Sequence, residues 1–136
     1  MGDRMKIRSL HPGFFSDPSL ARMSAHARLL YQGLWCMADD DGRGEWLPKA
    51  IEGSVFPFEE VDFLALVAEL EADGKIEHYQ TDGRAYWWLP NFCKWQNPRY
   101  KRKSTIPPPP SHEPAQALRE VSQTLAETVQ QEVEVV

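Results

Sequence analysis

Apolar residues recur every three or four positions between residues 24 and 38, which is the spacing of one face of an α-helix. Ser24 is a favourable N-cap, so the helix is expected to begin there. The acidic run 39–42 consists of three aspartates and a glycine, and we expect this turn-forming sequence to end the helix. The expected buried face contains Ala27, Leu30, Tyr31, Leu34, Trp35 and Ala38.

Two further helices are predicted before residue 75. The shorter one has Pro48 near its first turn and runs to about Ser54, before Pro57 stops it. The other covers about residues 59–72, and Gly74 stands where the C′ residue of a helix belongs. The buried stripe of this third helix is expected to contain Phe63, Leu66, Val67 and Leu70.

The sharpest local signal is Asp82-Gly83, a dipeptide that favours a two-residue type I′ turn between strand-forming segments. Only one face of the resulting hairpin can meet the helices, so the other must be covered by residues 91–100 or remain available to a partner. The predicted pairs are Thr81–Arg84, Gln80–Ala85, Tyr79–Tyr86, His78–Trp87, Glu77–Trp88 and Ile76–Leu89. Because side chains alternate along a strand, Ile76, Trp87 and Leu89 share one face, and Tyr79, Tyr86 and Trp88 share the other.

The composition changes after residue 103. Four prolines at 107–110 favour an extended arrangement with no core. We therefore expect a folded domain at 1–103 with a basic C-terminal extension, and a proline-rich linker at 104–112. Residues 113–136 are interpreted as an acidic tail that is either disordered or an amphipathic helix. Such a helix needs a partner surface, which is either its own domain or another chain, and a second copy of the chain in that role would make a homo-oligomer. The predicted fold class is mainly α with a small β-hairpin.

Charge is distributed unevenly along the chain. The 136 residues accommodate one compact domain, and the formal net charge of −5 argues against a protein that coats polyanions over its whole surface. Residues 39–82 hold thirteen acids and three bases, residues 94–103 hold five bases and no acid, and residues 104–136 hold five acids and one base. The chain therefore consists of an acidic body, a basic segment and an acidic tail.

The sequence lacks the motifs of enzyme chemistry. Its four histidines are scattered and its two cysteines form no CxxC motif, so no metal site, disulfide framework or cofactor is predicted. It contains no P-loop or dinucleotide fingerprint, and we expect a protein that is not an enzyme. No apolar run is long enough to span a membrane and no signal-peptide pattern follows the N-terminal bases, so a cytoplasmic location is expected.

Three helices followed by a two-stranded hairpin is the order of a winged helix-turn-helix, in which the third helix usually enters the major groove of DNA and the hairpin is the wing. Further motifs are IRSLHPGFF at 7–15, ARLLYQGLW at 27–35 with ADDDGR at 38–43, LVAELEADGKI at 66–76, and LPNF at 89–92 followed by WQNP at 95–98. With these motifs, the chain resembles small winged-helix DNA-binding modules of bacteriophages and prophages, of the replication-initiation or replisome-organiser type. The resemblance implies phage DNA metabolism in the host cytoplasm.

The third predicted helix departs from this expectation because it is acidic. No Lys or Arg lies between residues 50 and 74, and carboxylates in a groove of DNA are repelled by its phosphates. The acids form either a solvated helix face or a surface that binds a basic partner protein. The candidates for protein binding are Glu59, Glu60, Asp62 and Glu69.

The basic segment is the better candidate for a nucleic-acid site. It mixes cations with aromatic rings, a combination that favours phosphate neutralisation together with stacking on bases or sugars. The N-terminal Arg4, Lys6 and Arg8 would extend its positive surface. The alternative interpretation is that these bases only solubilise an extended linker. The predicted nucleic-acid-binding residues are Arg84, Lys94, Arg99, Tyr100, Lys101, Arg102 and Lys103.

Two hypotheses follow. The first is a non-enzymatic winged-helix protein that binds DNA with low sequence specificity, alone or with a replication or transcription protein, in replication initiation or transcriptional control. The second is an adaptor or inhibitor that uses the winged-helix body with its acidic third helix, or the terminal helix, to bind a host or phage protein. Bases gathered on one face favour the first hypothesis, and scattered bases beside an acidic or apolar patch favour the second.

Overall fold

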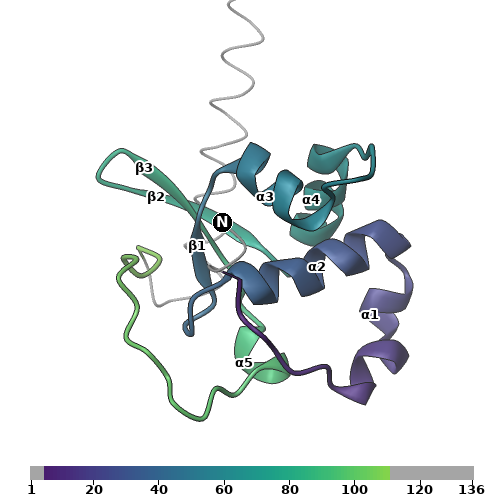
Figure 1. Cartoon of the computed structure of the whole chain (residues 1–136), viewed down its shortest axis with the longest axis horizontal. Helices are drawn as coiled ribbons and strands as arrows, with labels where there is room; N and C mark the ends of the chain where they lie inside the picture. The colour runs from purple at the N-terminus through teal and green to yellow at the C-terminus, as the bar shows by residue number, and fades with distance from the viewer. Residues whose placement is uncertain (1–4, 111–136) are drawn as a thin grey trace, which may run out of the picture.

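The computed structural model describes residues 5–110, so the predicted tail at 113–136 and Arg4 lie outside the described residues. Helix α2 runs through the centre, with α3 and α4 above it in the view of Figure 1 and the sheet to the left; α1 lies at the right, and α5 lies below the opposite end of α2. The elements in chain order are the 3₁₀ helix η2 (Pro12–Ser16), α1 (Pro18–Ala21), α2 (Ala25–Met37), β1 (Arg43–Glu45), α3 (Pro48–Val55), α4 (Phe63–Ala72), β2 (Glu77–Thr81), β3 (Arg84–Trp88) and α5 (Phe92–Trp95).

Helices α2 and α3 lie where the sequence predicts them. The Ser24 hydroxyl accepts a hydrogen bond from the backbone N–H of Ala27 at 3.1 Å and so caps the first turn of α2. The predicted face of α2 is buried. Gly33 faces α3, and a Cβ atom there would lie 2.6 Å from the side chain of Val55, so the glycine permits close packing of the two helices.

Helix α4 begins later than predicted. The prediction placed its start at about residue 59, but the helix begins at Phe63 because the Asp62 carboxylate accepts the backbone N–H of Ala65 at 3.2 Å and caps it there. The predicted C-terminal end is confirmed, since Gly74 has a φ of +70° immediately after the helix. Residues 59–62 are therefore part of the connection between α3 and α4.

The predicted hairpin is confirmed with its register, except that the outermost predicted pair, Ile76–Leu89, lies beyond the ends of β2 and β3. Asp82 and Gly83 have φ values of 53° and 77°, as a type I′ turn requires. The paired residues of β2 and β3 are Glu77–Trp88, His78–Trp87, Tyr79–Tyr86, Gln80–Ala85 and Thr81–Arg84. The hairpin projects beyond the helices (Figure 1).

The sequence analysis missed β1, which adds a third antiparallel strand in the order β1-β3-β2. The fold class is consequently a small α+β domain rather than helices with a lone hairpin. Gly44 lies opposite Trp87 in the β1–β3 ladder, and a Cβ atom on it would lie 2.3 Å from the indole. The indole N–H of Trp87 donates a hydrogen bond to the backbone carbonyl of Glu45 at 3.0 Å, and this bond stabilises the close packing of the indole on β1.

The two faces of the sheet are covered by different parts of the chain. Ile76, Trp87 and Leu89 are buried in the core with the helices. On the outer face, the Tyr79 hydroxyl donates to the backbone carbonyl of Pro107 at 2.7 Å. The expectation that residues 91–100 could cover this face was wrong, because the cover comes from residues 104–108.

Residues 91–100 contribute to the core elsewhere. Within them, the α5 residue Trp95 stacks on Trp35 of α2 with ring centroids 6.0 Å apart and makes a T-shaped contact with Phe14 of η2. Within residues 5–110, none of the helices has the length and apolar character needed to traverse a bilayer.

Candidate nucleic-acid interface

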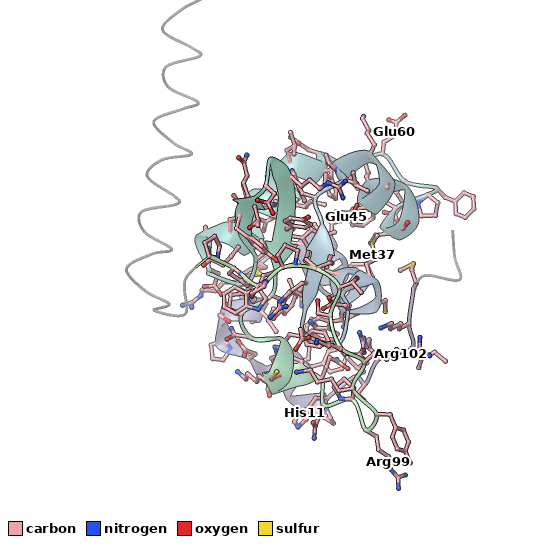
Figure 2. The ribbon with its side chains drawn as sticks, turned by 90° about the vertical axis from the view of Figure 1, so that its left-hand side faces the viewer. His11, Met37, Glu45, Glu60, Arg99 and Arg102 are labelled. Atoms are coloured by element: carbon pink, nitrogen blue, oxygen red, sulfur yellow. The ribbon has the colours of Figure 1, made fainter. Side chains whose placement is uncertain are left out.

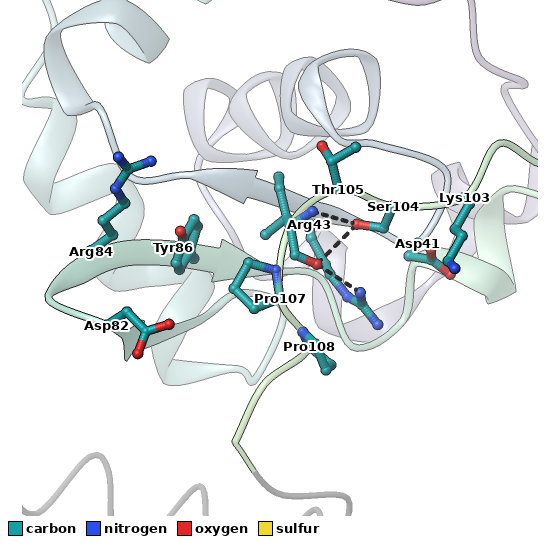
Figure 3. A pocket seen from close by; sticks show the side chains of 11 residues that line it. Asp41, Arg43, Asp82, Arg84, Tyr86, Lys103, Ser104, Thr105, Pro107 and Pro108 are labelled. Atoms are coloured by element: carbon teal, nitrogen blue, oxygen red, sulfur yellow. Dashed lines mark hydrogen bonds between the residues drawn. The ribbon is translucent and has the colours of Figure 1, made fainter.

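A groove of about 740 Å³ lies between the outer face of the sheet and the chain at 103–108. Figure 3 shows Arg84 near the hairpin tip and Lys103 at opposite ends of this groove, with Arg43 and Pro107 between them. Two of the seven predicted nucleic-acid-binding residues, Arg84 and Lys103, thus line the same groove. Arg43 is a third cation that the sequence analysis did not propose.

The groove also contains two carboxylates, Asp41 and Asp82. Asp41 is paired with the ammonium of Lys101 at 2.6 Å. The hydrogen bond and the charge of Asp41 raise the pKa of Lys101 above its ordinary value. The charge of Lys101 is therefore balanced within the chain, which separates it from Arg84 and Lys103.

The acidic turn that ends α2 holds the basic segment through three consecutive aspartates. Asp41 pairs with Lys101, Asp40 accepts the backbone N–H of Arg102 at 2.8 Å, and Asp39 accepts the hydroxyl of Ser104. The sequence analysis expected this turn only to terminate a helix. Its carboxylates instead act as an anchor for residues 101–104.

Asp40 is the buried centre of this anchor, with only 6% of its surface exposed. Its Oδ1 atom accepts hydrogen bonds from Arg8 at 3.0 Å and Lys6 at 3.3 Å. Burial raises the pKa of Asp40, but the hydrogen bonds from the Arg102 N–H, Arg8 and Lys6 outweigh it and lower the pKa to about 2.

The sequence suggested that Lys6 and Arg8 extend a positive surface, but in the structure both side chains bind Asp40. Besides binding Asp40, the Arg8 guanidinium donates to the backbone carbonyls of Trp35 and Ala38 at 2.8 and 2.9 Å, where it satisfies the C-terminal end of α2. Arg8 has 7% of its side chain exposed, so it is a structural cation.

The remaining predicted residues lie outside the groove. Lys94 on α5 pairs with Asp17, the N-cap of α1, at 3.2 Å. The Arg99 guanidinium lies 5.6 Å from the ring centre of Tyr100, and Figure 2 shows Arg99 pointing away from the body. Arg102 uses its backbone N–H on Asp40, and its side chain has no ion pair within the described residues. The predicted bases therefore do not form one face.

Most of the acids proposed for protein binding have partners within the chain. Glu59 pairs with His26 at 2.6 Å. Glu69 accepts the backbone N–H and the hydroxyl of Ser24 at 2.9 and 2.7 Å, and these bonds lower the pKa of Glu69. Asp62 caps α4. Glu60 is exposed and makes no ion pair within residues 5–110, and Figure 2 shows it at the edge of the molecule.

The exposed side of α4 is largely apolar, with Glu69 and Glu71 as its two acids. Its solvent-facing residues are dominated by Leu64, Ala65, Ala68 and Ala72, and Leu64 is 66% exposed. Phe58, in the connection before α4, is 98% exposed. Helix α4 contains no Lys or Arg.

Sequence reasoning missed Arg43 because it missed the strand that carries it. Arg43 is an isolated base in an acidic region, and β1 is three residues long with a central glycine, which gives no strand pattern. A usable signal was the glycine itself, because glycine in a strand marks a close approach of another group, here Trp87.

Comparisons with family models, curated proteins and solved structures give no significant match to the chain. The candidate site is therefore described by its geometry alone. Among residues 5–110, no three His, Cys, Asp or Glu side chains are grouped so as to hold a metal ion. The groove supplies guanidinium, ammonium and hydroxyl groups, which are the donors that bind phosphate oxygens.

Proposed function

We propose that the chain is a non-enzymatic winged-helix protein that binds nucleic acid through its phosphates at the groove beside the hairpin. The order α2, β1, α3, α4, β2, β3, with β1 paired to β3, supports a winged helix in which the β2–β3 hairpin is the wing. The resemblance to phage replication-initiation modules supports replication initiation or transcriptional control as the setting.

The observation that carries this proposal is the common groove of Arg84 and Lys103, with Arg43 between them. The wing residue and the extension residue are 19 positions apart in the sequence, and the fold places them on one concave surface. Two exposed cations on such a surface neutralise successive phosphates and release counterions. Arg84 and Lys103 have no ion pair within residues 5–110, so their charges are available.

Helix α4 supports phosphate contacts rather than base reading. Its exposed side offers Leu64 and alanines, which have no hydrogen-bonding groups for base edges, and Glu71, whose carboxylate is paired with His78 at 2.6 Å. Binding through the groove is therefore expected to discriminate poorly between sequences and to depend strongly on salt.

The test is the salt dependence of binding to a short duplex and to a single strand of mixed sequence. The double variant Arg84→Ala/Lys103→Ala should reduce the slope of log K against log salt by roughly 2 for the duplex, one unit for each lost phosphate contact. Arg22→Ala is the matched control, because Arg22 is an exposed arginine after α1 and does not line the groove. Equal slopes for the double variant and the wild type would contradict the proposal.

A second candidate function, protein binding by the body, is favoured by two observations: five of the seven predicted nucleic-acid-binding residues lie outside the groove, and apolar residues are exposed around α4. Phe58 and Leu64 are 98% and 66% exposed, and Glu60 lies in the same connection. Large apolar side chains left in water are typical of interaction surfaces. A partner captured from host extract after nuclease treatment, and lost with Phe58→Ser/Leu64→Ser, would favour this function over nucleic-acid binding.

A further inference from the structure

Each strand of the sheet contributes one side chain to the contact with residues 106–108. From β1, the Arg43 guanidinium donates to the backbone carbonyl of Ile106 at 3.1 Å. From β2, the Tyr79 hydroxyl donates to the carbonyl of Pro107 at 2.7 Å. From β3, Tyr86 lines the groove together with Pro107 (Figure 3). Two consecutive carbonyls of one segment are thus bound by donors from two different strands.

The floor beneath this segment is aromatic. Tyr79 and Tyr86 are directly opposite each other in the β2–β3 ladder, with ring centroids 5.5 Å apart. They are only 4% and 7% exposed, although they lie on the face of the sheet that does not meet the helices. The cover that buries them includes the segment at 104–108.

This chemistry is that of proline recognition. Proline has no N–H, and an extended proline-rich segment makes no internal hydrogen bonds, so its carbonyls are free to accept from a receptor. Proteins that bind such segments offer aromatic rings for the proline faces together with side-chain donors for the carbonyls. Tyr79, Tyr86 and Arg43 supply both.

We propose that the outer face of the sheet is a binding site for an extended Ile-Pro-Pro segment, which residues 106–108 occupy in cis. The partner of this site is a protein with a proline-rich segment of the same chemistry, preceded by serine and basic residues. Such a segment binds by displacing the chain's own residues. The proposal does not depend on nucleic-acid binding.

The cis segment is attached in a way that permits displacement. Ile106 and Pro107 are half-buried and Pro108 is exposed, so release uncovers little apolar surface of the segment itself. Upstream, the attachment is polar, through Lys101 to Asp41 and through Ser104 to Asp39. The groove of about 740 Å³ beside the segment leaves room for an incoming chain.

The experiment uses the full chain with Ser104→Ala/Pro107→Gly, an opened variant whose changes lie in the segment and leave the sheet intact. The probe is a fluorescent peptide with the sequence of residues 101–110, KRKSTIPPPP, and the control peptide has alanine at the positions of Pro107 and Pro108. The opened variant should bind the probe at least about tenfold more tightly than the wild type, because cis competition is reduced. The control peptide should bind at least about fivefold more weakly than the probe.

Two tyrosine variants in the opened background separate recognition from packing. Tyr79→Phe removes the hydroxyl that donates to Pro107 and should weaken probe binding about fivefold. Tyr86→Phe is the matched control, since the Tyr86 hydroxyl makes no hydrogen bond to residues 104–108. It should change the affinity less than twofold. Equal losses in the two variants would overturn the assignment of the Tyr79 hydroxyl to recognition.

Amide hydrogen exchange establishes whether the segment has been released. The N–H of Arg102, which bonds to Asp40 and keeps its acceptor in the opened variant, should exchange faster in that variant. Faster exchange without probe binding would overturn the proposal, because the uncovered sheet would then not bind the segment. Unchanged protection would also overturn it, because the segment would then not separate from the sheet.

Wild-type protein provides a second route if the opened variant does not fold. Excess probe, but not the control peptide, should then accelerate exchange of the Arg102 N–H, which bonds to Asp40 of the domain body, and failure to do so would overturn the proposal. If the wild-type protein is a dimer and Pro107→Gly abolishes the dimer, the occupant of the site is a second copy of the chain. This result would overturn the proposal that the partner is a different protein.

Discussion

Lys101 and Asp41 form an ion pair of 2.6 Å that joins the basic segment to the turn after α2. The two residues are 60 positions apart, and Asp41 also lines the candidate groove. The pair therefore influences the groove in two ways, because it neutralises a cation and fixes the chain that forms one wall. Its removal provides a direct test of how the chain's own acids limit polyanion binding.

Asp41→Asn is expected to strengthen nucleic-acid binding and to steepen its salt dependence by about one unit, because the variant releases Lys101 and removes a repulsive charge. Asp82→Asn is the control, since Asp82 lines the same groove but pairs with no base in the described residues. Asparagine also tolerates the φ of 53° at that position. Nucleic-acid affinity measured at several salt concentrations distinguishes the two variants. Equal gains in affinity would mean that the loss of a negative charge is responsible, and not the release of Lys101.

Gly44→Ala is expected to destabilise the domain by about 1–3 kcal/mol, because the added methyl group would lie 2.3 Å from the Trp87 indole. Gly53→Ala provides the opposite case, since no atom lies within 4 Å of a Cβ at that position in α3. Replacing glycine by alanine in a helix should stabilise the fold by roughly 0.5–1 kcal/mol. Urea unfolding measures both, and a tolerated Gly44→Ala would contradict the described β1–β3 packing.

Asp40→Asn is expected to lower the free energy of unfolding at pH 7 by about 2–3 kcal/mol, because it leaves Arg8 and Lys6 without their carboxylate. A lowered pKa in the folded state means that the carboxylate stabilises the protein above pH ~4. This contribution disappears as the pH falls toward the folded-state pKa of about 2. In urea unfolding from pH 7 down to pH ~2, the free energy of unfolding should fall less for Asp40→Asn than for the wild type. Identical pH profiles of the two proteins would show that Asp40 is not the source of the acid destabilisation.

Two truncations test where the folded domain ends. A chain that stops at Pro110 is expected to keep its thermal transition and to lose any self-association, as the sequence predicts for the tail. A chain that stops at residue 103 should melt at a lower temperature, because it lacks the bonds from Ser104 to Asp39 and from Tyr79 to Pro107. Equal melting temperatures would support the predicted boundary at residue 103.

The parts of the fold that short-range signals determine were predictable. Ser24 caps α2 through an atom three residues away, and Asp82-Gly83 sets the hairpin register by itself. The start of α4 was misplaced because several residues before it had plausible capping or helical character. Only the bond from Asp62 to Ala65 decides among them.

The candidate site was less predictable because its geometry depends on pairs distant in sequence. Arg84 and Lys103 were proposed separately, and only the folded chain places them on one groove. Residues 104–108 have the composition of a linker, and their contacts with Tyr79 and Arg43 cannot be inferred from local pattern. For the same reason, the sequence gives no sign that Lys101 is neutralised by Asp41.

Asp40 joins Lys6, near the start of the described chain, to Arg102, near its end. The segments entering and leaving the domain are therefore tied to the same buried carboxylate. Probes placed at Lys6 and at Arg102 would therefore report on the same point of the molecule, although the two residues are far apart in the sequence.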